Sequence, residues 1–157
     1  MMQNTSSGTA APLQVLLADD DIDDRSVFEI VLSALPMPTR LETVEDGEEL
    51  MSYLSENSEN LPDVLFLDLN MPKKNGSECL SEIKSNPKLQ RLPVIMYSTS
   101  VHNDVADQLY AKGAHYYFRK TDMIKIQNLL HHVLTLLVEN KFARPTRDKF
   151  VLALAVE

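Results

Sequence analysis

The run Val64-Leu65-Phe66-Leu67, which ends abruptly at Asp68, decides the fold. Four consecutive apolar residues are typical of a strand that is buried on both faces, because no polar residue alternates with them. Strands of this kind occur in parallel sheets that carry helices on both sides. An acid directly after the run lies at the carboxyl end of the strand, where ligands of parallel sheets collect.

The same pattern, a short apolar run followed by an amphipathic segment, recurs on both sides of this stretch. The predicted strands are residues 15–18, 41–44, 64–67, 94–97 and 115–118. Apolar residues at helical spacing predict helices at residues 25–35, from residue 46 onward, and at 77–84, 103–112 and 122–138. This alternation predicts an α/β fold in which an open, doubly wound, five-stranded parallel sheet carries helices on both faces. For such a sheet we expect the flavodoxin-like strand order 2-1-3-4-5.

Composition and charge narrow the class of protein. The formal net charge is -8 at pH 7, so we expect no basic face for nucleic acid or for an anionic membrane surface. No apolar run approaches the roughly 18 residues of a membrane span. The single cysteine, Cys79, excludes an intrachain disulfide and fits a reducing compartment, so we expect a cytoplasmic protein.

The chain divides into three predicted parts. Residues 1–12 are rich in Ser, Thr and Ala and predict a disordered leader, and residues 13–138 form the predicted domain. Residues 139–157 are a C-terminal extension with a basic hinge at 141–149 and an apolar end at 150–156. Because an exposed apolar strand favours association, this end either packs on the domain or forms a homodimer contact.

Polar residues follow four of the predicted strands. They are Asp19 and Asp20 after the first, Asp68 after the third, Ser98 after the fourth and Lys120 after the fifth. In the predicted order these strands are neighbours, so their carboxyl ends meet at one cleft. Carboxylates at close range repel one another, and a hard cation such as Mg2+ relieves the repulsion. An Asp carboxylate can also attack phosphorus and form an aspartyl phosphate.

Four motifs resemble those of the response-regulator receiver family (CheY-like), over about residues 13–137. They are LADDD at 17–21, LDLNMPKKNG at 67–76, YSTS at 97–100 and GAHYYFRK at 113–120. Each motif alone is weak, but four of them in this order are specific. The acidic run and the segment after Asp68 look similar to stand-alone receivers that are paired with bacterial phytochrome-type histidine kinases.

The resemblance implies a chemical role for each matching residue. Asp68 matches the phosphoacceptor, Asp20 the direct metal ligand and Asp19 a companion acid that acts through water. The backbone carbonyl of Asn70 is implied as a further ligand of Mg2+. Lys120 matches the lysine that pairs with the acceptor carboxylate or with its phosphate.

The other motif positions imply a conformational switch. Ser98 matches the switch hydroxyl, Tyr117 the aromatic residue whose ring turns inward, and Gly76 the end of the mobile loop after Asp68. The family pattern implies a single-domain response regulator that accepts a phosphoryl group from a sensor histidine kinase and signals to partner proteins. It implies no enzyme activity beyond self-phosphorylation and self-dephosphorylation.

Simpler interpretations exist for several of these residues. The acidic run 19–24 fits a solvated turn in which Asp21 and Asp23 cap the next helix. Ser98 fits a turn residue and Tyr117 an ordinary core aromatic. The histidines show no spacing that is typical of a metal site.

One position departs from the family pattern, which usually has a proline, often in a cis peptide, after the lysine. This chain has Thr121 there. A trans bond is the default for a non-proline residue, so the direction of Lys120 stays open at this point.

Two other functions compete with the receiver interpretation. A Mg-dependent phosphohydrolase similar to the haloacid dehalogenases would place its Asp nucleophile after the first strand, under a cap. Here the candidate nucleophile, Asp68, follows the third predicted strand. A degenerate receiver would serve as an unphosphorylated docking module, and the intact set of acids with Lys120 argues against it.

Overall fold

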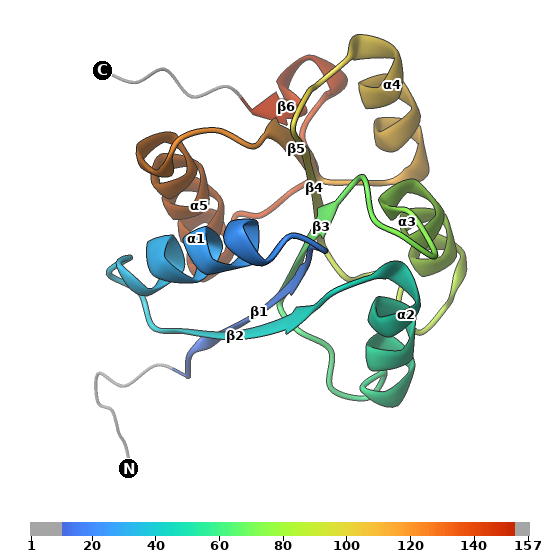
Figure 1. Cartoon of the computed structure of the whole chain (residues 1–157), viewed down its shortest axis with the longest axis horizontal. Coiled ribbons are helices and arrows are strands. Elements are labelled where there is room, and N and C mark those ends of the chain that lie inside the picture. The colour runs from blue at the N-terminus through green and yellow to red at the C-terminus, as the bar shows by residue number, and fades with distance from the viewer. Residues whose placement is uncertain (1–10, 153–157) are drawn as a thin grey trace.

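The computed structural model describes residues 11–152 and contains one parallel sheet (Figure 1). The strand order is β2-β1-β3-β4-β5-β6. The strands are β1 (Leu13–Ala18), β2 (Thr39–Val44), β3 (Val64–Asp68), β4 (Val94–Ser98), β5 (Tyr116–Arg119) and β6 (Val151–Leu152). The predicted order 2-1-3-4-5 is therefore confirmed, and the short strand β6 extends the sheet beyond β5. The predicted leader lies outside the described residues, apart from positions 11 and 12.

Helices cover both faces of the sheet. They are α1 (Ile22–Ser33), α2 (Gly47–Glu56), α3 (Gly76–Ser85), α4 (Asn103–Lys112), α5 (Met123–Val138) and the short 3-10 helix η1 (Arg147–Lys149). Figure 1 shows α1 and α5 together on one face, with α2, α3 and α4 on the other. None of the helices within residues 11–152 has the length and apolar character needed to cross a membrane.

The start of α1 differs from the prediction and matters for the site. The Asp21 side chain accepts hydrogen bonds from the N–H groups of Asp23 and Asp24, so the helix begins at Ile22. A side chain that accepts these unpaired N–H groups fixes the first turn. Asp21 is the cap, as predicted, whereas Asp23 lies inside the first turn. The early start places Asp24 in that turn.

The strand register brings the carboxyl ends of the central strands to one edge of the sheet. Ala18, the last residue of β1, pairs with Leu67, and Asp68 pairs with Tyr97 of β4. Ser98 then pairs with Arg119 of β5. Asp19, Asp68, Ser98 and Lys120 therefore follow or end adjacent strands, while the apolar residues before them form the core on both faces.

The C-terminal extension packs along β5. The N–H of Tyr117 donates to the carbonyl of Phe150 at 3.1 Å, and Tyr117 pairs with Val151 in the parallel ladder. The Phe150 ring is fully buried, with its centroid 5.2 Å from Tyr110 and 6.3 Å from Tyr117. Of the predicted apolar end, residues 150–152 therefore pack on their own domain, and residues 153–156 lie outside the described residues.

Replacing Phe150 by alanine tests this packing. Because the ring is fully buried between two aromatic side chains, we expect Phe150→Ala to lower the free energy of unfolding by roughly 3–5 kcal/mol. Ile124→Ala is the control, since this side chain is exposed and should change stability by less than about 0.5 kcal/mol. Urea unfolding followed by circular dichroism measures both. Equal losses in the two variants would contradict the packing of Phe150.

Candidate functional site

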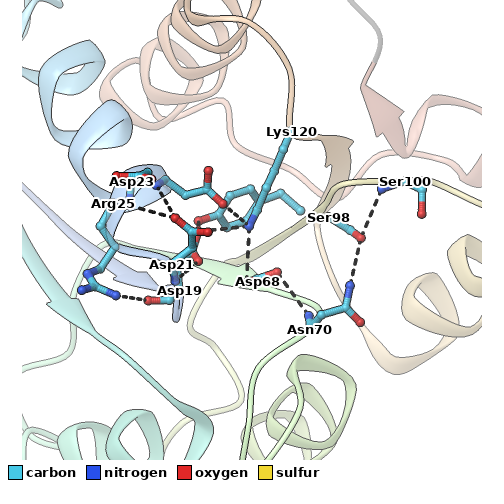
Figure 2. A network of polar contacts seen from close by, with 11 residues as sticks. Asp19, Asp21, Asp23, Arg25, Asp68, Asn70, Ser98, Ser100 and Lys120 are labelled. Carbon is cyan, nitrogen blue, oxygen red and sulfur yellow. Dashed lines mark hydrogen bonds and ion pairs between the residues drawn. The ribbon is translucent and has the colours of Figure 1, made fainter.

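One ammonium group joins carboxylates from three parts of the chain (Figure 2). Lys120 Nζ lies 2.8 Å from Asp24 Oδ2, 3.2 Å from Asp19 Oδ2 and 3.4 Å from Asp68 Oδ2. The backbone N–H of Lys120 donates to the carbonyl of Ser98 at 2.7 Å, which fixes the chain just after β5. The side chain of Lys120 is only 13% exposed, so these ion pairs lie mostly out of solvent.

The acids that follow β1 and β3 form a close cluster. One carboxylate oxygen each from Asp19, Asp20 and Asp68 lies within 4.8 Å of the other two. Asp19 and Asp68 are buried, whereas Asp20 is exposed. Carboxylates this close repel one another, and the single positive charge of Lys120 offsets only part of their negative charge.

The burial of this cluster shifts the pKa values of its groups. Burial raises the pKa of Asp68 above its ordinary value, the charge of Lys120 opposes that shift, and the charge of Asp19 adds to it. Burial alone would lower the pKa of Lys120, but its hydrogen bond to Asp24 and the charges of Asp68 and Asp19 raise it above the usual range. Lys120 is therefore held in its charged form.

Asp19 has hydrogen-bond donors on both oxygens. Its Oδ1 accepts from the N–H of Asp21 at 2.9 Å, and its Oδ2 accepts from the Tyr97 hydroxyl and lies against Lys120. Burial, followed by the charge of Asp19, raises the pKa of Tyr97 well above its ordinary value, so the phenol stays protonated and donates. A fully buried carboxylate needs such donors, because burying an unpaired charge is costly.

Ser98 is linked to Asp68 through Asn70. The N–H of Asn70 donates to Asp68 Oδ1 at 3.2 Å, and the Asn70 side-chain amide donates to Ser98 Oγ at 3.4 Å (Figure 2). The N–H of Ser100 points at the same hydroxyl oxygen at 3.5 Å. Ser98 is buried and is therefore not a solvent-exposed turn residue. Its hydroxyl lies among the polar groups of the site, next to Asn70. The backbone carbonyl of Asn70 stays a predicted metal ligand.

Tyr117 has its ring fully buried on the side of the sheet that α2, α3 and α4 cover. Its hydroxyl donates to the carbonyl of Ser100 at 3.2 Å, in the segment after β4. This hydrogen bond connects the Tyr117 ring to the loop that follows Ser98. A switch function for Tyr117 stays a prediction.

Comparison with known proteins agrees with this geometry. Residues 15–133 match the family model described as the response regulator receiver domain. The chain is similar to response regulator Rcp1 of Synechocystis sp. (strain ATCC 27184 / PCC 6803 / Kazusa), with 34% identity over 118 residues, or 73% of this chain and 80% of Rcp1.

The chain belongs to the response regulator receiver family.

Two solved receivers support the assignment. The phosphorylated cyanobacterial phytochrome response regulator RcpA has a TM-score of 0.74 and 32% identity, with 83% of this chain and 96% of RcpA covered. The Mn(2+)-bound form of Rcp1 has a TM-score of 0.73 and 29% identity, with 86% of this chain and all (100%) of that chain covered. The fold of this receiver is therefore the flavodoxin-like fold of its family.

The loop after Asp68 requires glycine at its end. The N–H of Gly76 donates to the carbonyl of Leu69 at 2.9 Å and closes the loop. A Cβ added at Gly76 would lie 2.4 Å from the carbonyl oxygen of Asp68, which is shorter than any ordinary non-bonded contact between a carbon and an oxygen atom. No peptide bond within residues 11–152 is cis, so the bond between Lys120 and Thr121 is trans. Lys120 Nζ still lies 3.4 Å from Asp68 Oδ2, so the ion pair forms with Thr121 in place of proline.

Two residues of the site were not predicted from the sequence. Asp24 makes the shortest of the three ion pairs of Lys120, and Tyr97 donates to Asp19. The signal for Asp24 was its place in the acidic run, where it could be taken for a helix-start acid. The signal for Tyr97 was a hydroxyl-bearing side chain at the end of an otherwise apolar strand.

The acidic cluster of this receiver fits a divalent metal ion. Asp19, Asp20 and Asp68 offer hard oxygen ligands from neighbouring strand ends, and a divalent cation offsets the repulsion that Lys120 leaves. The exposed Asp20 is open to an ion that enters from solvent, while the two buried acids set its position.

Removing the charge of Asp20 tests this assignment. We expect Asp20→Asn to weaken Mn2+ binding by about tenfold or more, because one carboxylate ligand is lost. Asp23→Asn is the matched control, since Asp23 is exposed, belongs to the same acidic run and lies outside the cluster. Electron paramagnetic resonance of free Mn2+ gives both dissociation constants. Equal constants in the two variants would rule out Asp20 as a ligand.

Proposed function

We propose that this receiver accepts a phosphoryl group on Asp68 from a histidine residue of a sensor kinase, with Mg2+ held at the acidic cluster. The observation that carries the proposal is the pairing of Asp68 with Lys120 at 3.4 Å, beside the acids Asp19 and Asp20. A buried carboxylate that is paired with a lysine and flanked by two acids fits reversible phosphorylation, which needs positioning and charge neutralisation more than covalent chemistry.

The proposed transfer starts from the ionised carboxylate of Asp68. One of its oxygens attacks the phosphorus of a phosphohistidine, the new O–P bond forms as the P–N bond breaks, and the imidazole nitrogen keeps the electron pair of that bond. The ammonium of Lys120 offsets the negative charge on the transferred oxygens. The N–H of Asn70, which donates to Asp68 Oδ1, holds the carboxylate in place for the attack.

Mg2+ is the proposed metal because it prefers oxygen ligands and keeps some of its water. When it is bound, it supplies positive charge next to the transferred phosphoryl oxygens. Asp20 and Asp68 are the proposed direct ligands, together with the backbone carbonyl of Asn70. Asp19, whose oxygens already accept from Asp21 and Tyr97, is proposed to act through a bound water.

The proposed signal leaves the site through Ser98. Phosphorylation adds about 1.5 to 2 negative charges and several strong acceptor oxygens, so the Ser98 hydroxyl gains a new acceptor. The hydroxyl now lies against the side-chain amide of Asn70 and the N–H of Ser100, and a move toward the phosphate exchanges those contacts. Tyr117, which holds the carbonyl of Ser100, is the proposed aromatic partner of this movement.

The proposed kinase is of the phytochrome type. The supporting observation is the likeness to RcpA, which is described as a cyanobacterial phytochrome response regulator.

Residues 13–138 are the proposed receiver domain, with residues 139–157 as an extension. A homodimer and a cytoplasmic location, both expected from the sequence, stay predictions. Transfer from purified histidine kinases of the same genome identifies the donor, since a cognate pair reacts much faster than the others.

Substitution of Asp68 tests the acceptor directly. With acetyl phosphate and Mg2+, we expect the wild-type chain to form an acid-stable but hydroxylamine-sensitive phosphoprotein, and Asp68→Asn to form none above background, because an amide oxygen is a poor nucleophile. Asp104→Asn is the control, an exposed acid at the start of α4 that should label like wild type. Intact-protein mass spectrometry measures the labelled fraction.

Two results would overturn the proposal. Normal labelling of Asp68→Asn would place the acceptor elsewhere. Multiple turnover of a small phosphate ester by the wild-type chain, far faster than loss of phosphate from the labelled protein, would favour the phosphohydrolase.

A further inference from the structure

Tyr97 lies at the site in an orientation that packing fixes. It belongs to β4, is only 4% exposed and pairs in register with Asp68. Its ring stacks on Phe118, with centroids 5.5 Å apart and an interplanar angle of 22°, and Phe118 in turn meets Phe66 edge-on at 6.5 Å. A ring held on this apolar face points its hydroxyl in one direction only.

That direction is toward Asp19. The Tyr97 hydroxyl donates to Oδ2 of this fully buried carboxylate, while the N–H of Asp21 donates to Oδ1. The carboxylate is therefore held at both oxygens, and its plane is fixed relative to Asp68 and Asp20. Without the hydroxyl, Oδ2 would keep Lys120 as its remaining partner at 3.2 Å.

Tyr97 also contacts Lys120. The Lys120 ammonium lies 4.8 Å from the centre of the Tyr97 ring, within the range of an attractive cation–π contact. Lys120 is drawn toward Asp24 at 2.8 Å and toward Asp68 at 3.4 Å. The Tyr97 hydroxyl already donates a hydrogen bond to the Asp19 carboxylate. Asp19 therefore attracts the Lys120 ammonium less strongly, and Lys120 can lie closer to Asp68.

We infer that Tyr97 is a positioning residue for phosphoryl transfer: its hydroxyl orients Asp19 and its ring supports Lys120. It is proposed to act through these two side chains, without a contact of its own to the metal or the phosphoryl group. The inference rests on the proposed function, since it assigns Asp19, Asp68 and Lys120 to the transfer site. The competing view is that Tyr97 only fills the core between the sheet and the helices α1 and α5, as Tyr116 of β5 does.

Tyr97→Phe isolates the hydroxyl, because phenylalanine keeps the ring, its stacking and its contact with Lys120. We expect Mg2+ binding to weaken by about tenfold and labelling by acetyl phosphate at saturating Mg2+ to slow by a similar factor, the usual effect of losing a partner that orients a ligand. Tyr116→Phe is the matched control, a buried tyrosine of β5 whose ring meets Phe142, and it should behave like wild type in both assays.

A spectroscopic readout separates positioning from packing. The chain has five tyrosines and no tryptophan, so near-ultraviolet difference spectra report tyrosine environments without a background from indole. Mg2+ should produce a tyrosine difference spectrum in wild type and in Tyr116→Phe. The cation would lie close to Asp19, the hydrogen-bond acceptor of the Tyr97 hydroxyl, and would change the electric field at that hydroxyl. This signal should be lost in Tyr97→Phe when enough Mg2+ is added to fill the site.

The outcomes distinguish this inference from the proposed function. If the wild-type chain labels on Asp68 but Tyr97→Phe binds Mg2+ and labels equally well, the inference is wrong and the proposed function stands. A loss of unfolding free energy in Tyr97→Phe with unchanged binding and labelling also overturns it, since that is the result of packing alone. If the wild-type chain takes no phosphoryl group on Asp68, the proposed function itself fails.

Discussion

The attraction between one mostly buried ammonium and the carboxylates around it is the interaction on which the rest of this structure depends. Lys120 follows β5, and its partners follow β1, end β3 or begin α1. Three carboxylates close together would otherwise push these segments apart, because burial removes the water that would screen them. Lys120 offsets part of this repulsion where the strand ends meet, and the negative charge that it leaves unbalanced makes the site suitable for a divalent cation.

A parallel sheet can bring these charged side chains together without placing them in the apolar core. Each of the central strands is covered by helices on both faces, so its middle residues are apolar and its polar side chains lie at or near the strand ends. The strand order then places those ends side by side. Stability and chemistry thus occupy different parts of the same strands: residues 64–67 build the core and Asp68 faces the site.

The sequence predicts what is local and misses what depends on distant contacts. Apolar runs located the first five strands, and the end of α4 at Gly113, which has a φ of 106°, was predictable because glycine adopts that conformation readily. The start of α1 was missed because the Asp21 cap, rather than apolar spacing, sets it. The strand β6 was missed because an apolar run does not reveal its partner, which is β5.

The same division holds within the site. Asp19 and Asp68 could be predicted because each stands directly after an apolar run, and Asp20 and Lys120 because each lies one residue further on. The strand order brings these positions close together. Tyr97 and Asp24 carry no such local mark. A tyrosine near the end of a buried strand is ordinarily core, and only the stacking on Phe118 sends its hydroxyl to Asp19. An acid in the first turn of a helix is ordinarily explained by its favourable interaction with the helix dipole. Asp24 has a second function only because Lys120 lies beside it.

The short strand β5 connects the site to the surface that the C-terminal extension covers. Lys120 directly follows this strand, while three residues earlier Tyr117 donates its N–H to Phe150 and its hydroxyl to Ser100. Packed interiors move between discrete arrangements and do not deform smoothly. The proposed phosphoryl group on Asp68 would draw Lys120 and Ser98, and this change would reach Tyr117 through the end of β5 and through the carbonyl of Ser100. The buried Phe150 ring packs next to Tyr117, with centroids 6.3 Å apart, and is therefore the proposed neighbour on which the change would act.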